Sequence, residues 1–100
     1  MEYNKLVRNR IPEILKEKGI NPQTHIADGK EFWEKLRQKL QEEVSEFLEE
    51  ENPGELADIL EVIIAICNFK DINREDLKNI RKNKAEQKGS FDNKIILEKT

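Results

Sequence analysis

The sequence has one cysteine, one histidine and no long apolar run, and each shortage excludes a class of protein. Cys67 has no second cysteine to pair with, which excludes an internal disulfide framework and indicates a small core residue in a reducing compartment. The uncharged run 62–69 is far shorter than the roughly 20 apolar residues of a membrane-spanning helix. No charged-then-apolar signal peptide opens the chain, so we expect a cytoplasmic protein without a membrane partner.

Basic residues also do not outnumber acidic ones. The chain has 18 lysine and arginine residues against 21 aspartate and glutamate residues, and the two signs are mixed along it. No overall positive field is available to hold a nucleic-acid backbone, so nucleic acid is not an expected partner. Although 39% of the residues are charged, the apolar residues recur periodically, which is typical of a folded chain.

Glycine and proline are few and fall where one structural element gives way to the next, with no repeat and no linker between domains. One domain over residues 1–100 is therefore expected. The tail at 91–97 is rich in isoleucine, and we expect a short strand or an extended arm that lies against the extended N-terminal segment, 3–7. Helices are predicted at about 12–19, 28–51, 55–70 and 73–88.

Capping residues mark the ends of these helices. Asp28 and Asn73 are each followed three residues later by an acid, which has the form of a capping box. Gly89 suits the C-terminal cap of the last helix. The sequence Asn-Pro-Gly at 52–54 stops the long helix, so a short turn joins the two central helices as an antiparallel hairpin.

Acidic residues interrupt the apolar faces of the two hairpin helices. At about 100° per residue, Glu43 falls inside the core stripe of the first helix, and Glu46 lies at its edge. Glu55 and Asp58 project to the apolar side of the second helix, whereas Glu61 is expected to point the opposite way. The residues that define these apolar faces are Phe32, Trp33, Leu36, Leu40, Val44 and Phe47 in the first helix and Ile59, Val62, Ile66 and Phe69 in the second.

Four carboxylates are therefore expected to converge on the hairpin interface, two from each helix. An unpaired buried carboxylate is costly, and four together repel one another unless a cation neutralises them. Oxygen ligands favour hard ions such as Mg²⁺, with Mn²⁺ as an alternative, because Zn²⁺ prefers cysteine or histidine and His25 lies in a loop. We expect a magnesium site formed by Glu43, Glu46, Glu55 and Asp58.

Charged residues at helical spacing more commonly form a solvated face. That interpretation applies to Glu49, Glu50 and Glu51, and Glu42 is a borderline case. A lone acid pair would also be read as solvated. Two pairs on consecutive helices, both on the apolar side, favour a site instead.

The acidic segments resemble a known motif. EEVSE at 42–46 and ELAD at 55–58 are similar to the EExxE…ExxD motif of the all-α nucleotide pyrophosphatases, the superfamily of MazG, dimeric dUTPases and phosphoribosyl-ATP pyrophosphohydrolase. YNKLVRNRIP at 3–12 and the segment 84–91 resemble the two ends of a compact MazG-like subgroup described as phosphoribosyl-ATP pyrophosphohydrolase-like. Asn9 and Arg10 depart from its LVRDK pattern, in which aspartate and lysine stand at these positions.

The resemblance implies an activity. It implies magnesium-dependent hydrolysis of a nucleoside triphosphate to the monophosphate and pyrophosphate, with the metal bound by Glu43, Glu46, Glu55 and Asp58. Glu42 corresponds to the leading acid of the motif, and Glu42 and Glu46 are the candidates to accept the proton of the attacking water. Which nucleotide is cleaved does not follow from the motif.

A triphosphate also needs cationic partners beyond a metal. Arg81, Lys84 and Lys88 share one side of the last helix with Leu77 and Ile80, and from there they are expected to reach inward over the site. The aromatic residues of the long helix are at core spacing and are expected to pack in the core. The candidates for substrate binding are Arg8, Lys39, Arg81, Lys84 and Lys88 for the phosphates and Asn4 for the base.

We predict an all-α fold, a helical bundle around an antiparallel hairpin with short extended N- and C-terminal segments. Helix 55–70 is apolar on most faces and needs more cover than a 100-residue monomer readily supplies, which predicts a homodimer or a tetramer. Two rival functions stay open. One is the phosphoribosyl-ATP pyrophosphohydrolase of histidine biosynthesis, which would use the same acids. The other is a non-catalytic helical dimerisation or binding module whose acids pair with lysine and arginine.

Overall fold

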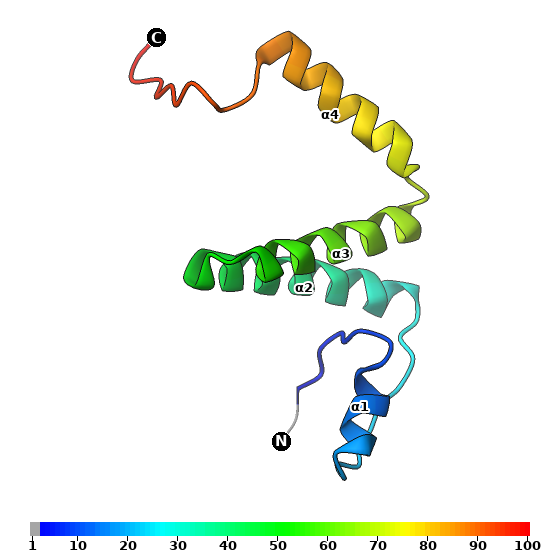
Figure 1. The fold of residues 1–100 in the computed structure, drawn as a ribbon. Coiled ribbons are helices and arrows are strands. Elements are labelled where there is room, and N and C mark those ends of the chain that lie inside the picture. The colour runs from blue at the N-terminus through cyan, green and yellow to red at the C-terminus, as the bar shows by residue number, and fades with distance from the viewer. Residues whose placement is uncertain (1–2) are drawn as a thin grey trace.

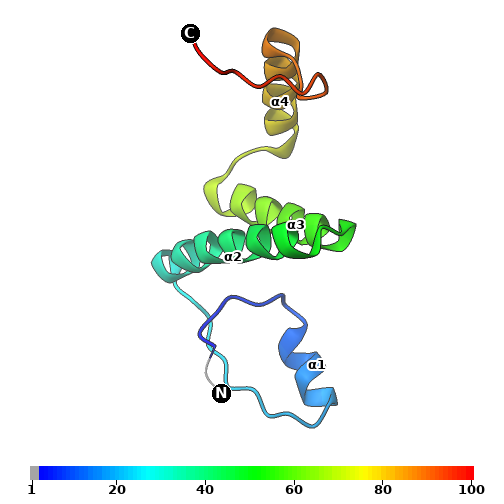
Figure 2. The same cartoon turned by 90° about the vertical axis from the view of Figure 1, so that its left-hand side faces the viewer.

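The computed structural model describes residues 3–100, with helices α1 (Ile11–Glu17), α2 (Gly29–Glu50), α3 (Pro53–Lys70) and α4 (Arg74–Lys88) (Figure 1). No strand occurs in this part of the chain, which confirms the predicted all-α class. α2 and α3 form the hairpin, and α1 and α4 lie on opposite sides of it in both views (Figures 1 and 2). Within residues 3–100, none of the helices combines the length and apolar character needed to cross a bilayer.

Side-chain caps set where the longer helices begin. The Asp28 carboxylate accepts a hydrogen bond from the backbone N–H of Glu31 at 2.8 Å. Asn52 accepts from the backbone N–H of Glu55 at 3.1 Å, and Asn73 accepts from two backbone N–H groups of α4 at 2.8 and 3.1 Å. Each cap satisfies donors that have no partner in the first helical turn, and the caps predicted at Asp28 and Asn73 are confirmed.

The turn between α2 and α3 is only two residues long. Glu51 ends α2 in the left-handed region, with φ 52°. Pro53 begins α3 two residues before the predicted start, because the fixed φ of proline suits the first helical position. A Cβ at Gly54 would lie 3.1 Å from Oδ1 of Asn52, so glycine keeps the cap free of crowding. This short turn makes α2 and α3 antiparallel neighbours.

The small core lies where α2 and α3 pack together. Leu36 of α2 is 1% exposed, and Val62 and the free cysteine Cys67 of α3 are also buried, as predicted for the single thiol. Val44 was predicted to lie in the core stripe, but it is 39% exposed. The prediction is wrong there because α3 covers only part of the apolar stripe of α2, and Val44 lies outside the covered part.

An aromatic cluster lies at the end of the hairpin away from the turn. The Phe69 ring packs edge-on against Phe32, with centroids 5.3 Å apart, and stacks on Trp33 at 5.9 Å. The Lys70 ammonium lies 4.1 Å from the centre of the Trp33 ring. These contacts confirm the predicted packing role of Phe32 and Trp33, and they hold the open end of α2 against α3.

The N-terminal segment lies against the hairpin before α1 begins. Residues 6–10 line a pocket together with side chains of α2 and α3. α1 then leads away from the hairpin, has no buried residue, and ends near Gly19, which has φ 81° (Figure 2). The segment therefore matters to the site more through residues 6–10 than through the helix that follows.

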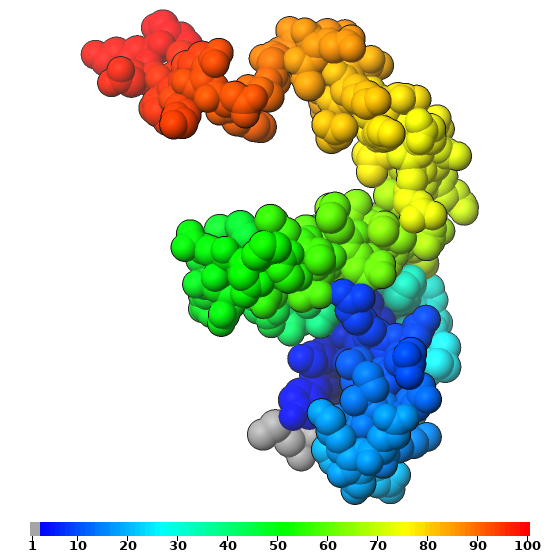
Figure 3. All heavy atoms as spheres, viewed as in Figure 1, coloured from blue at the N-terminus to red at the C-terminus, as the bar shows by residue number. Residues whose placement is uncertain are grey.

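α4 and the residues after it stand apart from the hairpin. Residues 89–100 form an irregular, mostly extended arm, and Figure 3 shows open space between this arm and α3. Residues 3–7 and 91–97 lie at opposite ends of the molecule, whose extents are 56 × 31 × 24 Å. The expectation that the tail lies against the N-terminal segment is wrong, because α4 carries the tail away from it.

We expect Leu36→Ala to lower the free energy of unfolding by about 2–5 kcal/mol, because it leaves a cavity at the most buried position. Urea unfolding followed by circular dichroism measures the change. Ile26→Ala is the control, since Ile26 is 97% exposed and should change the stability by less than about 0.5 kcal/mol. Equal losses in the two variants would contradict a core between α2 and α3.

Candidate metal centre

Three carboxylates meet where α2 packs on α3. Glu43 of α2 and Glu55 and Asp58 of α3 each offer an oxygen, and these oxygens lie within 4.8 Å of one another. Glu55 and Asp58 share one side of α3 because they are three residues apart, and the hairpin places that side opposite Glu43. The structure thus brings together three of the four acids that were expected to converge.

Glu43 is buried to a degree that is rare for a carboxylate. Its exposed fraction is 5%, and among the described residues its Oε2 has no hydrogen-bond partner. The Oε2 of Glu55 is also buried without a partner within residues 3–100. A buried polar atom left unsatisfied costs about 1–3 kcal/mol, and more when it is charged. Both oxygens are therefore available to bind a cation.

Lys39 is a counter-ion within the hairpin. It lies one turn before Glu43 in α2, and its Nζ is 3.1 Å from Glu43 Oε1 and 3.2 Å from Glu42 Oε2. Burial lowers the pKa of Lys39, but its hydrogen bonds to Glu43 and Glu42 outweigh burial, so the pKa is raised above its ordinary value. Lys39 therefore stays positively charged at neutral pH.

Glu42 and Glu46 stand in different surroundings. Burial raises the pKa of Glu42, but the hydrogen bond and charge of Lys39, and then those of Lys5 at 3.4 Å, outweigh it, so the pKa is lowered. The pKa of Glu46 is raised, first by burial and then by the negative charges of Glu43 and of other acids nearby. Of these two candidates, Glu46 is the stronger proton acceptor.

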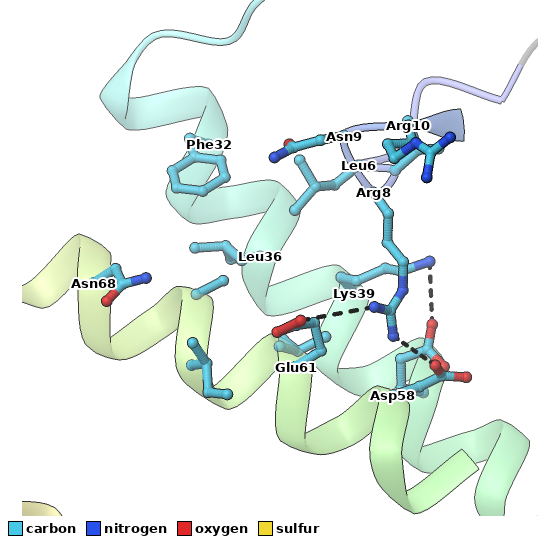
Figure 4. Close-up of a pocket in the computed structure, with 15 residues that line it drawn as sticks. Leu6, Arg8, Asn9, Arg10, Phe32, Leu36, Lys39, Asp58, Glu61 and Asn68 are labelled. Atoms are coloured by element: carbon cyan, nitrogen blue, oxygen red, sulfur yellow. Dashed lines mark hydrogen bonds and ion pairs between the residues drawn. The ribbon is translucent and has the colours of Figure 1, made fainter. Parts of the chain in front are cut away.

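Arg8 reaches the acids from the N-terminal segment (Figure 4). Its Nη2 donates to Oδ1 of Asp58 at 2.7 Å, and its Nη1 lies 3.7 Å from Glu61. Glu61 was predicted to point away from the side of Asp58, and that prediction is wrong. Residues three apart on a helix are neighbours on one face, so one guanidinium can bridge both carboxylates.

Acids outnumber bases at this site, which is negatively charged as a result. A divalent cation would offset most of the excess negative charge. Its attraction to the carboxylates would be strong because the distances are short and the site is partly desolvated. Six carboxylates, those of Glu42, Glu43, Glu46, Glu55, Asp58 and Glu61, face three basic side chains, those of Lys5, Arg8 and Lys39.

A pocket of about 500 Å³ opens beside the acids, between the N-terminal segment and the hairpin. Arg8, Lys39 and Asp58 lie at one end of it, and Asn9 and Asn68 lie away from that end (Figure 4). Apolar side chains of α2 and α3 form much of the wall between these two regions. The pocket therefore offers charged groups at one end and two amides elsewhere on its wall.

Not every predicted residue is part of this site. Arg81, Lys84 and Lys88 are exposed on α4, which stands away from the acids of its own chain (Figure 3). They do not reach inward over the site of this chain as expected, because the turn after α3 directs α4 outward. Asn4 is exposed with φ 45° and does not line the pocket.

Three residues of the site were missed. Asn9 was noted only as a departure from the family pattern, yet it lines the pocket where that pattern has aspartate. Asn68 follows Glu61 by two helical turns, and its lone amide in the apolar run 62–69 is the sequence signal that could have identified it. Lys5 reaches Glu42 only through the tertiary fold, so no sequence signal indicated that pair.

The donor set fits a hard divalent cation. The clustered groups are all carboxylates, which Mg²⁺ and Mn²⁺ prefer. Ligand oxygens around one Mg²⁺ at about 2.1 Å are separated by at most about 4.2 Å. The oxygens here lie within 4.8 Å, so small rotations about the side-chain bonds suffice to bring them into range.

Comparison of the chain with family models, with curated proteins and with solved structures finds no match. The residues of the site are compatible with a cation site and with an internal network of ion pairs, since Arg8 and Lys39 each contact an acid of the cluster. The two interpretations differ in whether a divalent cation stabilises the folded protein.

Magnesium is expected to raise the melting temperature of the protein. A cation that binds only the folded state at a hundred times its dissociation constant adds about 2.7 kcal/mol, which is roughly 10–20 °C for a domain of this size. Glu43→Gln should lose most of this shift in differential scanning fluorimetry. Glu49→Gln, an exposed acid of the same helix, should keep it. No shift in the wild type, or an equal shift in Glu43→Gln, would contradict the site.

Arg8→Gln should strengthen the binding of Mg²⁺ alone, by roughly threefold to tenfold, because it removes a positive charge that competes for Asp58. Isothermal titration calorimetry with the metal measures this. Arg10→Gln is the matched control, since Arg10 pairs with Glu13 and not with an acid of the cluster. Unchanged or weaker binding in Arg8→Gln would show that the cation does not use Asp58.

Proposed function

We propose that this protein is a magnesium-dependent nucleotide pyrophosphohydrolase of the MazG-like type, which cleaves a nucleoside triphosphate to the monophosphate and pyrophosphate. The observation that carries the proposal is the cluster of Glu43, Glu55 and Asp58, with two unpartnered buried oxygens, beside a pocket lined by Arg8 and Lys39. Acids alone suit a cation. Acids next to basic groups at a pocket suit a cation bound together with phosphate groups.

The clustered acids would hold the cation. Glu43, Glu55 and Asp58 supply oxygens from two helices, and Glu46, one turn beyond Glu43 in sequence, is the fourth acid of the motif. When bound, Mg²⁺ neutralises phosphate charge and lowers the pKa of water. The unpartnered oxygens of Glu43 and Glu55 gain a partner in that state, which offsets the cost of burying them.

Arg8 and Lys39 are placed to bind phosphate oxygens. Both line the pocket and both already contact acids of the cluster. An arginine forms two parallel hydrogen bonds to a phosphate as readily as to a carboxylate, so Arg8 can exchange Asp58 for substrate. Lys39 is held in place by two glutamates and contributes a fixed positive charge. These two side chains would orient the phosphates towards the acids.

Glu46 is the residue that would accept a proton from the attacking water. A new bond from the water oxygen to the α-phosphorus forms while the bond from that phosphorus to the bridging oxygen breaks, and pyrophosphate leaves. Glu42 is less suitable because Lys39 and Lys5 both neutralise it and lower its pKa. Glu46 has no basic partner within salt-bridge distance among residues 3–100.

The rest of the pocket suits a nucleoside. A volume of about 500 Å³ is within the range of roughly 300–1,000 Å³ that is usual for small-molecule sites. The amides of Asn9 and Asn68 both donate and accept hydrogen bonds, as the edge of a base requires. Phe32 and Leu36 provide apolar wall against which a base or ribose can pack.

A non-catalytic ion-pair module is the second candidate, and a specific observation favours it. Arg8 and Lys39 already pair with Asp58 and Glu43 at 2.7 and 3.1 Å, so part of the acid charge is offset without a metal. That interpretation leaves the Oε2 atoms of Glu43 and Glu55 unpartnered, which is why we place it second.

The assay that tests the proposal measures pyrophosphate and monophosphate release from common and modified nucleoside triphosphates and from phosphoribosyl-ATP, with and without magnesium. We expect magnesium-dependent turnover of at least one of them. Glu43→Gln and Asp58→Asn should lower kcat/KM by roughly a hundredfold or more, because each removes a charge that holds the cation. Glu49→Gln should leave kcat/KM unchanged, since the Glu49 side chain is exposed near the C-terminal end of α2 and is not one of the clustered acids.

Each other outcome has a definite meaning. Release of orthophosphate in place of pyrophosphate would contradict attack at the α-phosphorus. Turnover that persists in Glu43→Gln and Asp58→Asn would place the activity outside this site. A preference for phosphoribosyl-ATP would assign the protein to the histidine-pathway reaction, and no turnover of any substrate would favour the ion-pair module.

A further inference from the structure

Of the two basic residues that line the charged end of the pocket, Arg8 is the less firmly held. The Lys39 side chain is 18% exposed and lies within 3.2 Å of two glutamates of its own helix, which fix its position. The Arg8 side chain is 54% exposed, and the Asp58 and Glu61 side chains that it pairs with are 38% and 52% exposed. Exposed ion pairs contribute little net free energy, so Arg8 can exchange one partner for the other at low cost.

The backbone around Arg8 is held by its own turn and not by the hairpin. The carbonyl of Arg8 accepts a hydrogen bond from the backbone N–H of Ile11 at 3.0 Å, at the start of α1. Within residues 3–100, no backbone hydrogen bond joins residues 3–10 to α2 or α3. The polar contacts that the structure describes between this segment and the hairpin are ion pairs of side chains, those of Lys5 and Arg8. The place of the guanidinium therefore depends on its acidic partners.

The two carboxylates that Arg8 contacts have different surroundings. Asp58 belongs to the cluster of acids whose oxygens lie within 4.8 Å of one another, and it accepts a hydrogen bond from Arg8 at 2.7 Å. Glu61 is outside that cluster, and its Oε1 lies 3.7 Å from Arg8 Nη1, which is too far for a hydrogen bond. Figure 4 shows the guanidinium between these two carboxylates. Arg8 is thus bonded to a candidate metal ligand and has a second acid close by that is not one.

Arg8 and a cation at the cluster compete for Asp58. An Asp58 carboxylate that ligates a divalent cation is a weaker partner for the guanidinium, and the two positive charges repel each other at short range. Arg8 would then leave Asp58, and with no other acid nearby its long side chain would have to be ordered again for each phosphate group that it binds. Glu61 lies three residues along α3 on the same face and lines the same pocket, so it offers the guanidinium a second position there.

We propose that Glu61 is a positioning residue, which retains Arg8 at the charged end of the pocket when Asp58 ligates a cation. Arg8 bonds to Asp58 in the metal-free chain, and in the metal-bound chain it bonds to Glu61 and faces the phosphate groups. A movement of about 1 Å turns the present contact with Glu61 into a hydrogen bond. The inference rests on the proposed function for the cation and the phosphate groups, but it does not depend on which nucleotide is cleaved.

A double-mutant cycle on magnesium binding tests this role in the full-length protein without nucleotide. Isothermal titration calorimetry gives the dissociation constant of Mg²⁺ for the wild type, Glu61→Ala, Arg8→Gln and the double variant. We expect Glu61→Ala to weaken binding by roughly threefold to tenfold, because Arg8 is then left with Asp58 as its partner. In the Arg8→Gln background the same substitution should weaken binding by less than about twofold, since only the screened charge of Glu61 is lost.

The control and the other outcomes separate this role from the metal site itself. Glu13→Ala removes the acidic partner of the neighbouring Arg10 and should leave the dissociation constant unchanged. Equal effects of Glu61→Ala in the two backgrounds would overturn the positioning role and leave the metal site in place. No magnesium binding by the wild type would overturn both. Neither result involves turnover, so a failed hydrolysis assay would contradict the proposed function and not this role.

Nuclear magnetic resonance of the Arg8 side chain supplies an independent readout. The Nε–H signal of Arg8 is assigned by its absence from Arg8→Gln, and its heteronuclear NOE distinguishes an anchored guanidinium from one that moves freely within nanoseconds. In the wild type we expect the NOE to stay high when Mg²⁺ is saturating. In Glu61→Ala it should be high without magnesium and fall at saturation. A fall in the wild type, or a high value in both proteins at saturation, would show that Glu61 does not hold Arg8 and would overturn the proposal.

Discussion

The rest of the site depends on one constraint, the burial of the Glu43 carboxylate between two helices. α2 and α3 pack closely through Leu36 and Val62, and this packing also takes Glu43 out of water. Lys39 satisfies one of its oxygens at 3.1 Å and leaves the other unpartnered. A hydrophobic residue at position 43 would remove that cost, so stability alone does not account for a carboxylate there.

The residues around Glu43 form a cluster of both acidic and basic side chains. Glu55 and Asp58 add oxygens from the facing helix, and Arg8 arrives from the N-terminal segment to offset part of their charge. The same guanidinium that competes with a cation for Asp58 is suited to hold a phosphate group. In the proposed function, Arg8 would therefore oppose metal binding and favour substrate binding, because both depend on where its single positive charge lies.

The shape of the chain follows from how little it buries. Leu36, Val62 and Cys67 are the buried apolar residues described in residues 3–100, and they are too few to offset the conformational entropy of ordering 100 residues. Helices ordered by their caps still present aliphatic surface to water at both the hairpin and α4.

Local features were predictable from the sequence, because they depend on residues close together in the chain. Asp28 and Asn73 cap helices through hydrogen bonds from backbone N–H groups two or three residues away, and the short turn that the sequence Asn-Pro-Gly at 52–54 predicts makes α2 and α3 antiparallel. Helical spacing then places Glu55 and Asp58 on one side of α3. Only the tertiary structure decided that Arg8, 50 residues away, reaches Asp58, that Asn9 lines the pocket, and that α4 with Lys84 stands away from its own acids. Those outcomes depend on the path of turns and on packing between distant segments, which no local pattern specifies.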